Sequence, residues 1–465
     1  MPTSASSSDR TPVSSLVSWG HGVVRRIPGR LLDQNVLAGA RSALGVLLIR
    51  IIGAGLTYVS ALILARWLGT RGFGAYAYVL VVVTQLGLAF SLGFNSSSLR
   101  FVASYLASGR RRRLAGFLRY SFGFVTLSSL IGAACSAALV VTFRDRLDPD
   151  YVEPLLVGCA CIPIWTLLNQ LESTARGLGQ VQTAYVPGYI LRPAALIGII
   201  ATLKTSGVAV DTEGAVWALF ASCAVAGTVQ AVLVLRRARA NCTGCAARMH
   251  GGHWTSVSLT FLTIDAFRIL LDNIDVLLIG KILGATDVAI YFAVVRTSGL
   301  VSFIPFSVIA FAVPRFAEIH NRGDRRDLQR YVDHVLRLVV WPTLVAALGM
   351  LAIGPFLLSL FGADFRAGYP TMVAILIGLV IRTATMPAEY LLNMTGHHRD
   401  TVRVYGCAAA ASVALNAIAI PTFGLIGAAA ASYVAMIGGN LALCWFVRKR
   451  LGLSAAIGLR ILHAR

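Results

Sequence analysis

Charged residues are scarce in this chain. Only 13% of its 465 residues are Asp, Glu, Lys or Arg, and 57% are hydrophobic, whereas a soluble globular protein carries about 25% charged residues. Acids are the rarer kind, with 20 Asp and Glu against 41 Lys and Arg, so the formal net charge is +21. This composition excludes an ordinary soluble protein and predicts that most of the chain lies in lipid.

Common catalytic and nucleotide-binding motifs are also missing. The sequence contains no Gly-x4-Gly-Lys-Ser/Thr phosphate loop and no Gly-x-Ser-x-Gly nucleophile turn, which argues against ATP-driven transport by this chain alone. The segments expected outside the membrane are short, which leaves little room for the extramembrane domain of a membrane enzyme such as an oligosaccharide polymerase. We therefore expect neither an enzyme nor a bound cofactor.

The eight cysteines form no recognisable disulfide framework, because most lie inside apolar stretches, where cysteine acts as a small apolar residue. Cys242, Cys245, His250 and His253 are the exception, since Cys-x2-Cys-x4-His matches the first three ligands of a zinc knuckle. The fourth knuckle position is Thr255, although His253 could substitute for it. We interpret the segment as a metal-free loop and keep a zinc site as the alternative.

The apolar residues are grouped into about twelve stretches of roughly 20 residues, which is enough to cross a bilayer as helices. These stretches cover 42–65, 74–94, 120–142, 154–175, 182–203, 214–235, 257–283, 287–313, 334–361, 368–393, 403–421 and 423–447. Basic clusters such as 110–113 and 448–450 lie between or after them on one side, so the positive-inside rule places those segments and both termini in the cytoplasm. Topology thus explains the positive charge, and we expect no nucleic-acid partner.

The two halves of the sequence repeat. One constant offset pairs Arg66 with Lys281, Gly69 with Gly284, Tyr76 with Tyr291 and Phe101 with Phe316, and a second offset pairs Gly214 with Gly424 and Ser222 with Ser432. Six spans per half give both halves the same orientation, as in transporters built from parallel repeats. We predict six-helix bundles at 42–235 and 257–447, a cytoplasmic linker at 236–256, and cytoplasmic tails at 1–41 and 448–465.

Five arginines lie inside the apolar stretches, far from their ends: Arg50, Arg192, Arg268, Arg296 and Arg382. Each would cost about 2.5–3.5 kcal/mol at the bilayer centre, so such residues usually face a protein interior or a polar cavity. A cationic cavity indicates an anionic passenger, and guanidinium groups match phosphate by forming two parallel hydrogen bonds. We hypothesise that several of these arginines bind a pyrophosphate, while a structural ion pair or snorkelling to the membrane interface remains the alternative for each.

The span at 257–283 is the most polar. Asp265, Arg268, Asp272 and Asp275 follow each other at spacings of three, four and three, so a continuous helix would place them on one stripe about 80° wide. The stripe is interpreted either as a self-neutralising ladder, in which Arg268 pairs with Asp265 and Asp272, or as an interior surface whose carboxylates take part in ion or proton coupling.

Two further acids lie near predicted cytoplasmic span ends. Glu172 and Glu389 could each neutralise an arginine or act as a coupling carboxylate, and Glu389 follows Arg382 by seven residues, which predicts the same helix face. The Pro187-Gly188 pair precedes Arg192 by about one turn. We expect the helix to be kinked or locally opened there, which membranes tolerate only where other groups or a cavity satisfy the backbone.

Several segments together resemble a known family. These are ILARWLGTRGFGAYAYV at 63–79 followed by SLGFNSSSLRF, DVLLIGKILGATDVAIYFAV at 275–294 followed by FAVPRF, and LLNMTGHHRD followed by NAIAIPTFGLIGAAAAS. Over residues 40–450 the chain resembles the polysaccharide-biosynthesis flippases, which move undecaprenyl-pyrophosphate-linked oligosaccharides across the bacterial inner membrane. They share a superfamily with multidrug extruders and peptidoglycan lipid flippases.

The resemblance implies an all-α fold in which two six-helix bundles form a V around a cationic central cavity. It also implies alternating access driven by a coupling cation (proton or sodium) or by the membrane potential. The lipid-linked oligosaccharide and the bilayer would be the partners, with a polysaccharide polymerase and synthesis proteins as candidates. A cation-coupled drug extruder would use the acids instead, and a peptidoglycan lipid flippase would use the arginines but usually has fourteen spans.

Overall fold

The computed structural model describes residues 29–207, 210–242, 246–322, 324–395 and 398–455. The chain divides into two compact units, Met1–Leu47 and Leu48–Arg465. In the first unit the described residues, from Gly29 onward, belong to the first helix. The second unit holds the rest of that helix and all later elements.

Every element of the described chain is helical. The α-helices are α1 (Gly29–Phe90), α2 (Phe94–Ala107), α3 (Arg111–Thr142), α4 (Pro149–Gly177), α5 (Val181–Val186), α6 (Arg192–Thr205), α7 (Thr212–Cys242), α8 (Gly251–Ile282), α9 (Ala285–Gly299), α10 (Phe303–Asn321), α11 (Arg325–Ser359), α12 (Tyr369–Thr383), α13 (Pro387–Met394) and α14 (His398–Leu451). Short turns of 3-10 or π-helix are η2 (Arg144–Arg146), η3 (Pro187–Leu191), η4 (Leu300–Ser302) and η5 (Ala363–Gly368). We call α1–α7 the N-terminal half and α8–α14 the C-terminal half.

Nine segments of the described chain are long and apolar enough to cross a membrane. Two of them, Gly45–Phe90 and Asp400–Leu451, have 46 and 52 residues, about twice the ~20 residues of one crossing. Helix α8 coincides with the remaining predicted span. Large apolar side chains remain exposed along these helices, for example Val345 at 67% and Phe423 at 72%, as expected of surfaces in lipid. The prediction of an all-helical, multi-pass membrane protein is confirmed.

Glycines divide the two longest helices. Gly69 interrupts α1 with φ 69° and ψ −179°, and Gly424 interrupts α14 with φ 58° and ψ −138°. Gly284, the residue that the repeat pairs with Gly69, precedes α9 with φ 102° and ψ −175°. Side chains with a Cβ rarely adopt such angles. The matched glycines therefore turn the chain in similar ways in the two halves.

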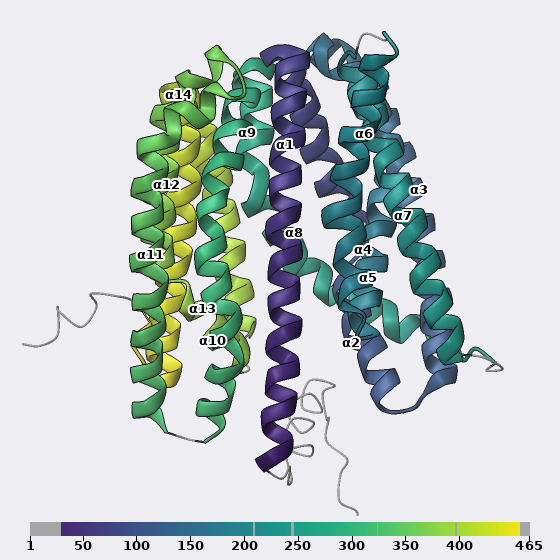
Figure 1. Cartoon of the computed structure of the whole chain (residues 1–465), viewed down its shortest axis with the longest axis vertical. Coiled ribbons are helices and arrows are strands. Elements are labelled where there is room, and N and C mark those ends of the chain that lie inside the picture. The colour runs from purple at the N-terminus through teal and green to yellow at the C-terminus, as the bar shows by residue number, and fades with distance from the viewer. Residues whose placement is uncertain (1–28, 208–209, 243–245, 323, 396–397, 456–465) are drawn as a thin grey trace, which may run out of the picture. The chain divides into compact units, whose positions relative to one another are not determined.

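Helices of each half pack against one another along the chain. In the N-terminal half α4 contacts α2, α3 and α7, and α6 contacts α7, whereas in the C-terminal half α14 contacts α8, α12 and α13, and α11 contacts α10 and α12 (Figure 1). Aromatic packing joins the halves, because the buried Phe73 ring lies 6.0 Å from Phe292 and 6.1 Å from Phe365. Tyr58 and Thr297 also share a hydrogen bond of 3.3 Å between α1 and α9.

Helix α8 contacts helices of both halves. Near its start, the Trp254 indole donates to the Tyr105 hydroxyl at 3.0 Å, and Gln85 donates to the Ile269 carbonyl at 2.6 Å. The helix breaks at Asn273, where φ is −150° and ψ is 16°, and it also packs against α9 and α14. Helix α8 is thus hydrogen-bonded to α1 and α2 of the N-terminal half and packed against α9 and α14 of the C-terminal half.

Two breaks correct the predicted helix faces. The stripe on α8 is not continuous, because Asn273 leaves the helical conformation between Asp272 and Asp275. Arg382 and Glu389 do not share one helix either, since α12 ends at Thr383 and α13 begins at Pro387. Both predictions assumed uninterrupted helices.

Candidate functional site

Arg50 on α1 lies against two aromatic rings. Its guanidinium carbon is 5.2 Å from the Tyr185 ring centroid and 5.6 Å from that of Tyr189, within the range of cation–π attraction. Its Nε is buried and has no hydrogen-bond partner in the described structure. The charge is therefore stabilised by ring faces, and a donor remains available.

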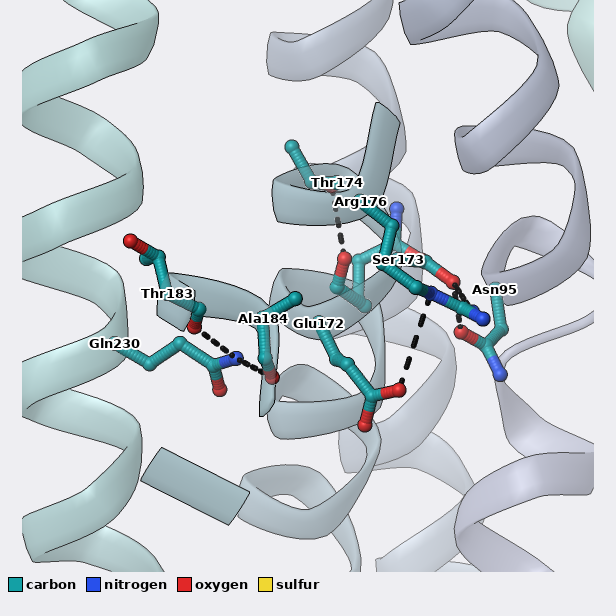
Figure 2. A network of polar contacts seen from close by, with 9 residues as sticks. Asn95, Glu172, Ser173, Thr174, Arg176, Thr183, Ala184 and Gln230 are labelled. Atoms are coloured by element: carbon teal, nitrogen blue, oxygen red, sulfur yellow. Dashed lines mark hydrogen bonds and ion pairs between the residues drawn. The ribbon is translucent and has the colours of Figure 1, made fainter. Parts of the chain in front are cut away.

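The predicted opening before Arg192 is confirmed. Residues Pro187–Leu191 form one turn of π-helix, and Pro187 has no N–H to offer the carbonyl of Thr183. Gln230 on α7 replaces it, because its Nε2 donates to the Thr183 carbonyl at 3.2 Å and to the Ala184 carbonyl at 3.1 Å (Figure 2). Arg192 Nε donates to the Gly188 carbonyl at 3.2 Å. A carbonyl of the opened turn thus accepts a hydrogen bond from the Nε end of the Arg192 guanidinium group.

Arg192 and Arg296 bring two positive charges together from different halves. The Arg192 guanidinium carbon lies 4.8 Å from the Trp165 ring centroid, and that of Arg296 lies 4.7 Å from the Phe292 centroid. The two charges are close enough to repel each other. Among the described residues neither arginine forms an ion pair with a carboxylate. Of the five arginines predicted from the sequence, these two are the least compensated by nearby negative charge.

Glu172 belongs to a polar network between α2 and α4 (Figure 2). Arg176 Nε lies 3.9 Å from its carboxylate, and Arg176 Nη2 donates to the Ser173 hydroxyl at 2.8 Å. That hydroxyl in turn donates to Asn95 Oδ1 at 2.7 Å. The charge of Arg50 also acts on Glu172, but Arg176 is the arginine that pairs with it.

The C-terminal half places two of its intramembrane arginines, Arg268 and Arg382, beside acids. Arg268 Nε lies 3.7 Å from the Asp272 carboxylate, with side chains 71% and 50% exposed, so this part of the predicted ladder is confirmed. Arg382 lies within electrostatic range of Asp272. Glu389 lies within electrostatic range of the Tyr405 hydroxyl. The positive charges of Arg268 and Arg382 are therefore compensated by nearby acids.

The other two acids of α8 are bound by hydroxyl groups. Ser96 on α2 donates to the Asp265 carboxylate at 3.0 Å and 3.3 Å. The Asp275 carboxylate accepts from the Tyr291 hydroxyl at 2.5 Å and from the Ser432 hydroxyl at 3.3 Å. Tyr291 and Ser432 both belong to residue pairs that are matched in the internal repeat, and they place Asp275 where α9 and α14 meet α8.

The aromatic and amide partners of the arginines were not predicted from the sequence. Tyr185 and Tyr189 are four residues apart and just precede Arg192. Their helical spacing could have predicted one helix face covered by aromatic rings. Trp165 and Gln230 carry no such local signal, because their partners are far away in sequence.

The zinc alternative at 242–253 is not tested, because Cys245 and the side chain of Cys242 lie outside the described residues. Elsewhere in the described chain, no three His, Cys, Asp or Glu side chains gather closely enough to hold a metal ion.

Known proteins resemble this chain in sequence and fold. A Shigella flexneri protein named "Putative O-antigen transporter" is 24% identical over 409 residues, which cover 82% of this chain and 91% of that protein. An inward-facing multidrug resistance MATE family transporter of the MOP superfamily matches with a TM-score of 0.68 at 14% identity, over 87% of this chain and 98% of that one. The lipid II flippase MurJ in an inward closed conformation matches with a TM-score of 0.67 at 14% identity, over 87% of each chain.

These structural matches show a shared transporter fold. The sequence match is more specific, since residues 40–320, more than half of the chain, match the family described as "Polysaccharide biosynthesis protein". The chain therefore belongs to the polysaccharide biosynthesis protein family.

Proposed function

We propose that this protein moves an undecaprenyl-pyrophosphate-linked oligosaccharide across the bacterial inner membrane for surface polysaccharide synthesis. The observation that carries the proposal is the approach of Arg192 and Arg296, one from each half, without a carboxylate to neutralise them. Holding two uncompensated guanidinium groups in an apolar protein is unfavourable. A bound pyrophosphate would relieve that repulsion and accept hydrogen bonds from both forks.

The other predicted arginines would extend this anion-binding site. Arg50 keeps a free Nε beside two tyrosine rings, and Arg268 remains 71% exposed despite its pairing with Asp272. Together with Arg382 they would line a cationic cavity along which the pyrophosphate and sugars pass. The prenyl chain would stay in lipid, because lipid solvates it as well as a protein interior would.

Alternating access follows naturally from a site built by two halves. When Arg192 and Arg296 both contact one pyrophosphate, movement of one half against the other exposes the anion to one side at a time. We propose that a coupling cation (proton or sodium), or the membrane potential, drives the cycle. Asp272 and Asp275 flank the break at Asn273, so a change in their charge would act at the point where α8 bends.

The same proposal predicts the orientation of the protein in the membrane and its partners. Both termini would lie in the cytoplasm, where the linked oligosaccharide is assembled, and a polymerase and synthesis proteins would be partners at the membrane. A cationic drug is less well suited as cargo, because the carboxylates of the site are already engaged, Asp272 by Arg268 and Glu172 by Arg176.

The proposal is tested by deleting the gene and analysing undecaprenyl lipids by mass spectrometry, with surface polysaccharide measured alongside. We expect a lipid-linked oligosaccharide to accumulate and the surface glycan to disappear. Complementation with the Arg192→Ala/Arg296→Ala variant should fail although the protein is present. Arg144→Ala, which removes an exposed arginine of η2, is the matched control and should restore export.

Other outcomes separate the alternatives. Increased drug sensitivity with unchanged lipids and glycans would replace the proposal with a drug extruder. Accumulation of a peptidoglycan precursor would keep the pyrophosphate site but change the cargo.

A further inference from the structure

A pocket lies where the linker between the halves meets α2 and α3. It has a volume of about 200 Å³ and is lined by Arg100, Tyr105, Arg110, Arg113, His250 and His253. This volume is below the roughly 300–1,000 Å³ of pockets for drug-sized ligands. It suits a single small polar group and is too small for an oligosaccharide.

The lining of this linker pocket carries one sign of charge. Arg100, Arg110 and Arg113 come from α2 and from the start of α3, and in the described structure no ion pair joins any of them to an acid. The Nδ1 atom of His250 is buried and lacks a hydrogen-bond partner there. Three guanidinium groups oppose a metal cation beside the histidines, whereas they favour an anion.

Two helices begin at this pocket. Helix α3 starts after Arg110 and α8 starts after His250, and neither has an acidic residue in its first turn or a side-chain cap. The unpaired N–H groups and the positive dipole end of a helix favour negative charge. These backbone features add to the arginines in the same place.

The linker is fixed to the N-terminal half beside the pocket. The Arg248 N–H donates to the Arg112 carbonyl at 3.0 Å, and a Cβ at Gly116 would clash with the Arg248 carbonyl. A few residues later, the Trp254 ring is fully buried against Phe117, at 5.4 Å between centroids. An anion in the pocket would therefore touch both the linker and α2–α3.

We propose that the linker pocket binds a phosphate group, separately from the arginines of the transport site, and that the bound phosphate holds the linker against α2 and α3. The group would be a phosphomonoester, a phosphodiester or inorganic phosphate, bound by Arg100, Arg113 and the linker histidines. It could belong to the head group of an anionic phospholipid or to a free phosphate, and the test separates these sources. This inference does not depend on the nature of the transported cargo.

The test uses the full chain in phosphatidylcholine nanodiscs and measures hydrogen–deuterium exchange of residues 246–255. One arm adds inorganic phosphate at constant ionic strength, and the other replaces part of the lipid by phosphatidylglycerol. We expect slower exchange in at least one arm. Arg100→Ala/Arg113→Ala should weaken the apparent affinity by about tenfold or more, since a hydrogen bond to a charged group contributes about 1.5–3 kcal/mol.

Arg112→Ala is the matched control, because its side chain is exposed and does not line the pocket. It should respond to phosphate as the wild type does. Protection by phosphatidylglycerol alone would identify a lipid head group, and protection by inorganic phosphate would identify a free phosphate. If the double variant does not fold, His250→Gln provides the same comparison. Unchanged exchange of the wild type in both arms, or an equal loss in Arg112→Ala, would overturn the proposal.

Discussion

The intramembrane arginines of this protein have two kinds of surroundings, one found on α1, α6 and α9 and the other on α8 and α12. Arg50 and Arg192 in the N-terminal half rest on tyrosine and tryptophan rings, and Arg296 in the C-terminal half rests on a phenylalanine ring. In the C-terminal half Arg268 pairs with Asp272, and Arg382 lies near the same carboxylate. Aromatic rings stabilise a cation without neutralising it, whereas a carboxylate neutralises it. In the proposed transport cycle, the ring-backed Arg50, Arg192 and Arg296 would attract the anion, while the acids beside Arg268 and Arg382 would take part in ion coupling.

The largest effect should come from removing the uncompensated arginines. Arg192→Ala/Arg296→Ala should lower export of the lipid-linked glycan by about 100-fold or more, because each lost charge-assisted hydrogen bond costs about 1.5–3 kcal/mol. Arg268→Ala/Arg382→Ala should lower it less. Export is measured as surface glycan per copy of protein. Equal losses in both double variants would show that ring-backed arginines and arginines beside acids contribute alike to export.

Substitution of the matched glycines tests whether the two halves contain the same kind of backbone turn. Gly69→Ala and Gly284→Ala should each destabilise the protein by about 1–3 kcal/mol, because their backbone angles strain any residue with a Cβ. Gly55→Ala is the control, since Gly55 lies within α1 with open space at its Cβ position, and alanine favours helices. Thermal unfolding in detergent measures the difference. A drop for only one of the two glycines would break the equivalence of the halves.

The opened turn of the N-terminal half should depend on one amide. Gln230→Ala leaves the Thr183 carbonyl without a donor, and a buried polar group without a partner costs about 1–3 kcal/mol. We expect a lower unfolding temperature and reduced export, because Arg192 follows that turn. Gln182→Ala, on the exposed surface of α5, should change neither. Unaltered stability in Gln230→Ala would mean that another group, such as water, can satisfy the carbonyl.

The ring contacts of Arg50 should produce a smaller effect. Tyr185→Phe keeps the aromatic face and should preserve export. Tyr185→Leu removes it, and the loss of about 0.5–2 kcal/mol of cation–π attraction predicts a decrease of about twofold to thirtyfold in export. If phenylalanine were as harmful as leucine, the hydroxyl rather than the ring would be the important group.

The smallest effect is expected for the exposed ion pair of α8. Arg268→Ala and Arg268→Ala/Asp272→Ala should differ little in unfolding temperature, because exposed pairs contribute about 0.2–1 kcal/mol. Export should be higher in the double variant, which leaves no unpaired carboxylate in the path of an anion. Lower export in the double variant would instead indicate that Asp272 acts in coupling.

Local sequence patterns predicted the features that depend on neighbouring residues. Apolar stretches of sufficient length became helices, and Pro187 opened the helix before Arg192. In each case the physical cause lies within one helical turn. The break before Pro387 was also foreseeable, because proline lacks the N–H that would continue the helical hydrogen bonds.

The remaining features depend on distant segments. Tyr185 reaches Arg50 and Ser96 reaches Asp265 only because separate helices meet, and no spacing in the sequence encodes those meetings. The break at Asn273 lies in a run without glycine or proline. The residues around Asn273 contain no local helix breaker, so we attribute the break to packing against distant helices.

The bend at Asn273 also makes the start of α8 a lever arm. From Gly251 to Asp272 the helix rises about 33 Å at 1.5 Å per residue. A rotation of about 10° at Asn273 would therefore sweep His250 through roughly 6 Å at that length, more than the reach of any hydrogen bond. A small angular change beside Asp275 is thus large enough to make or break every contact that holds the linker.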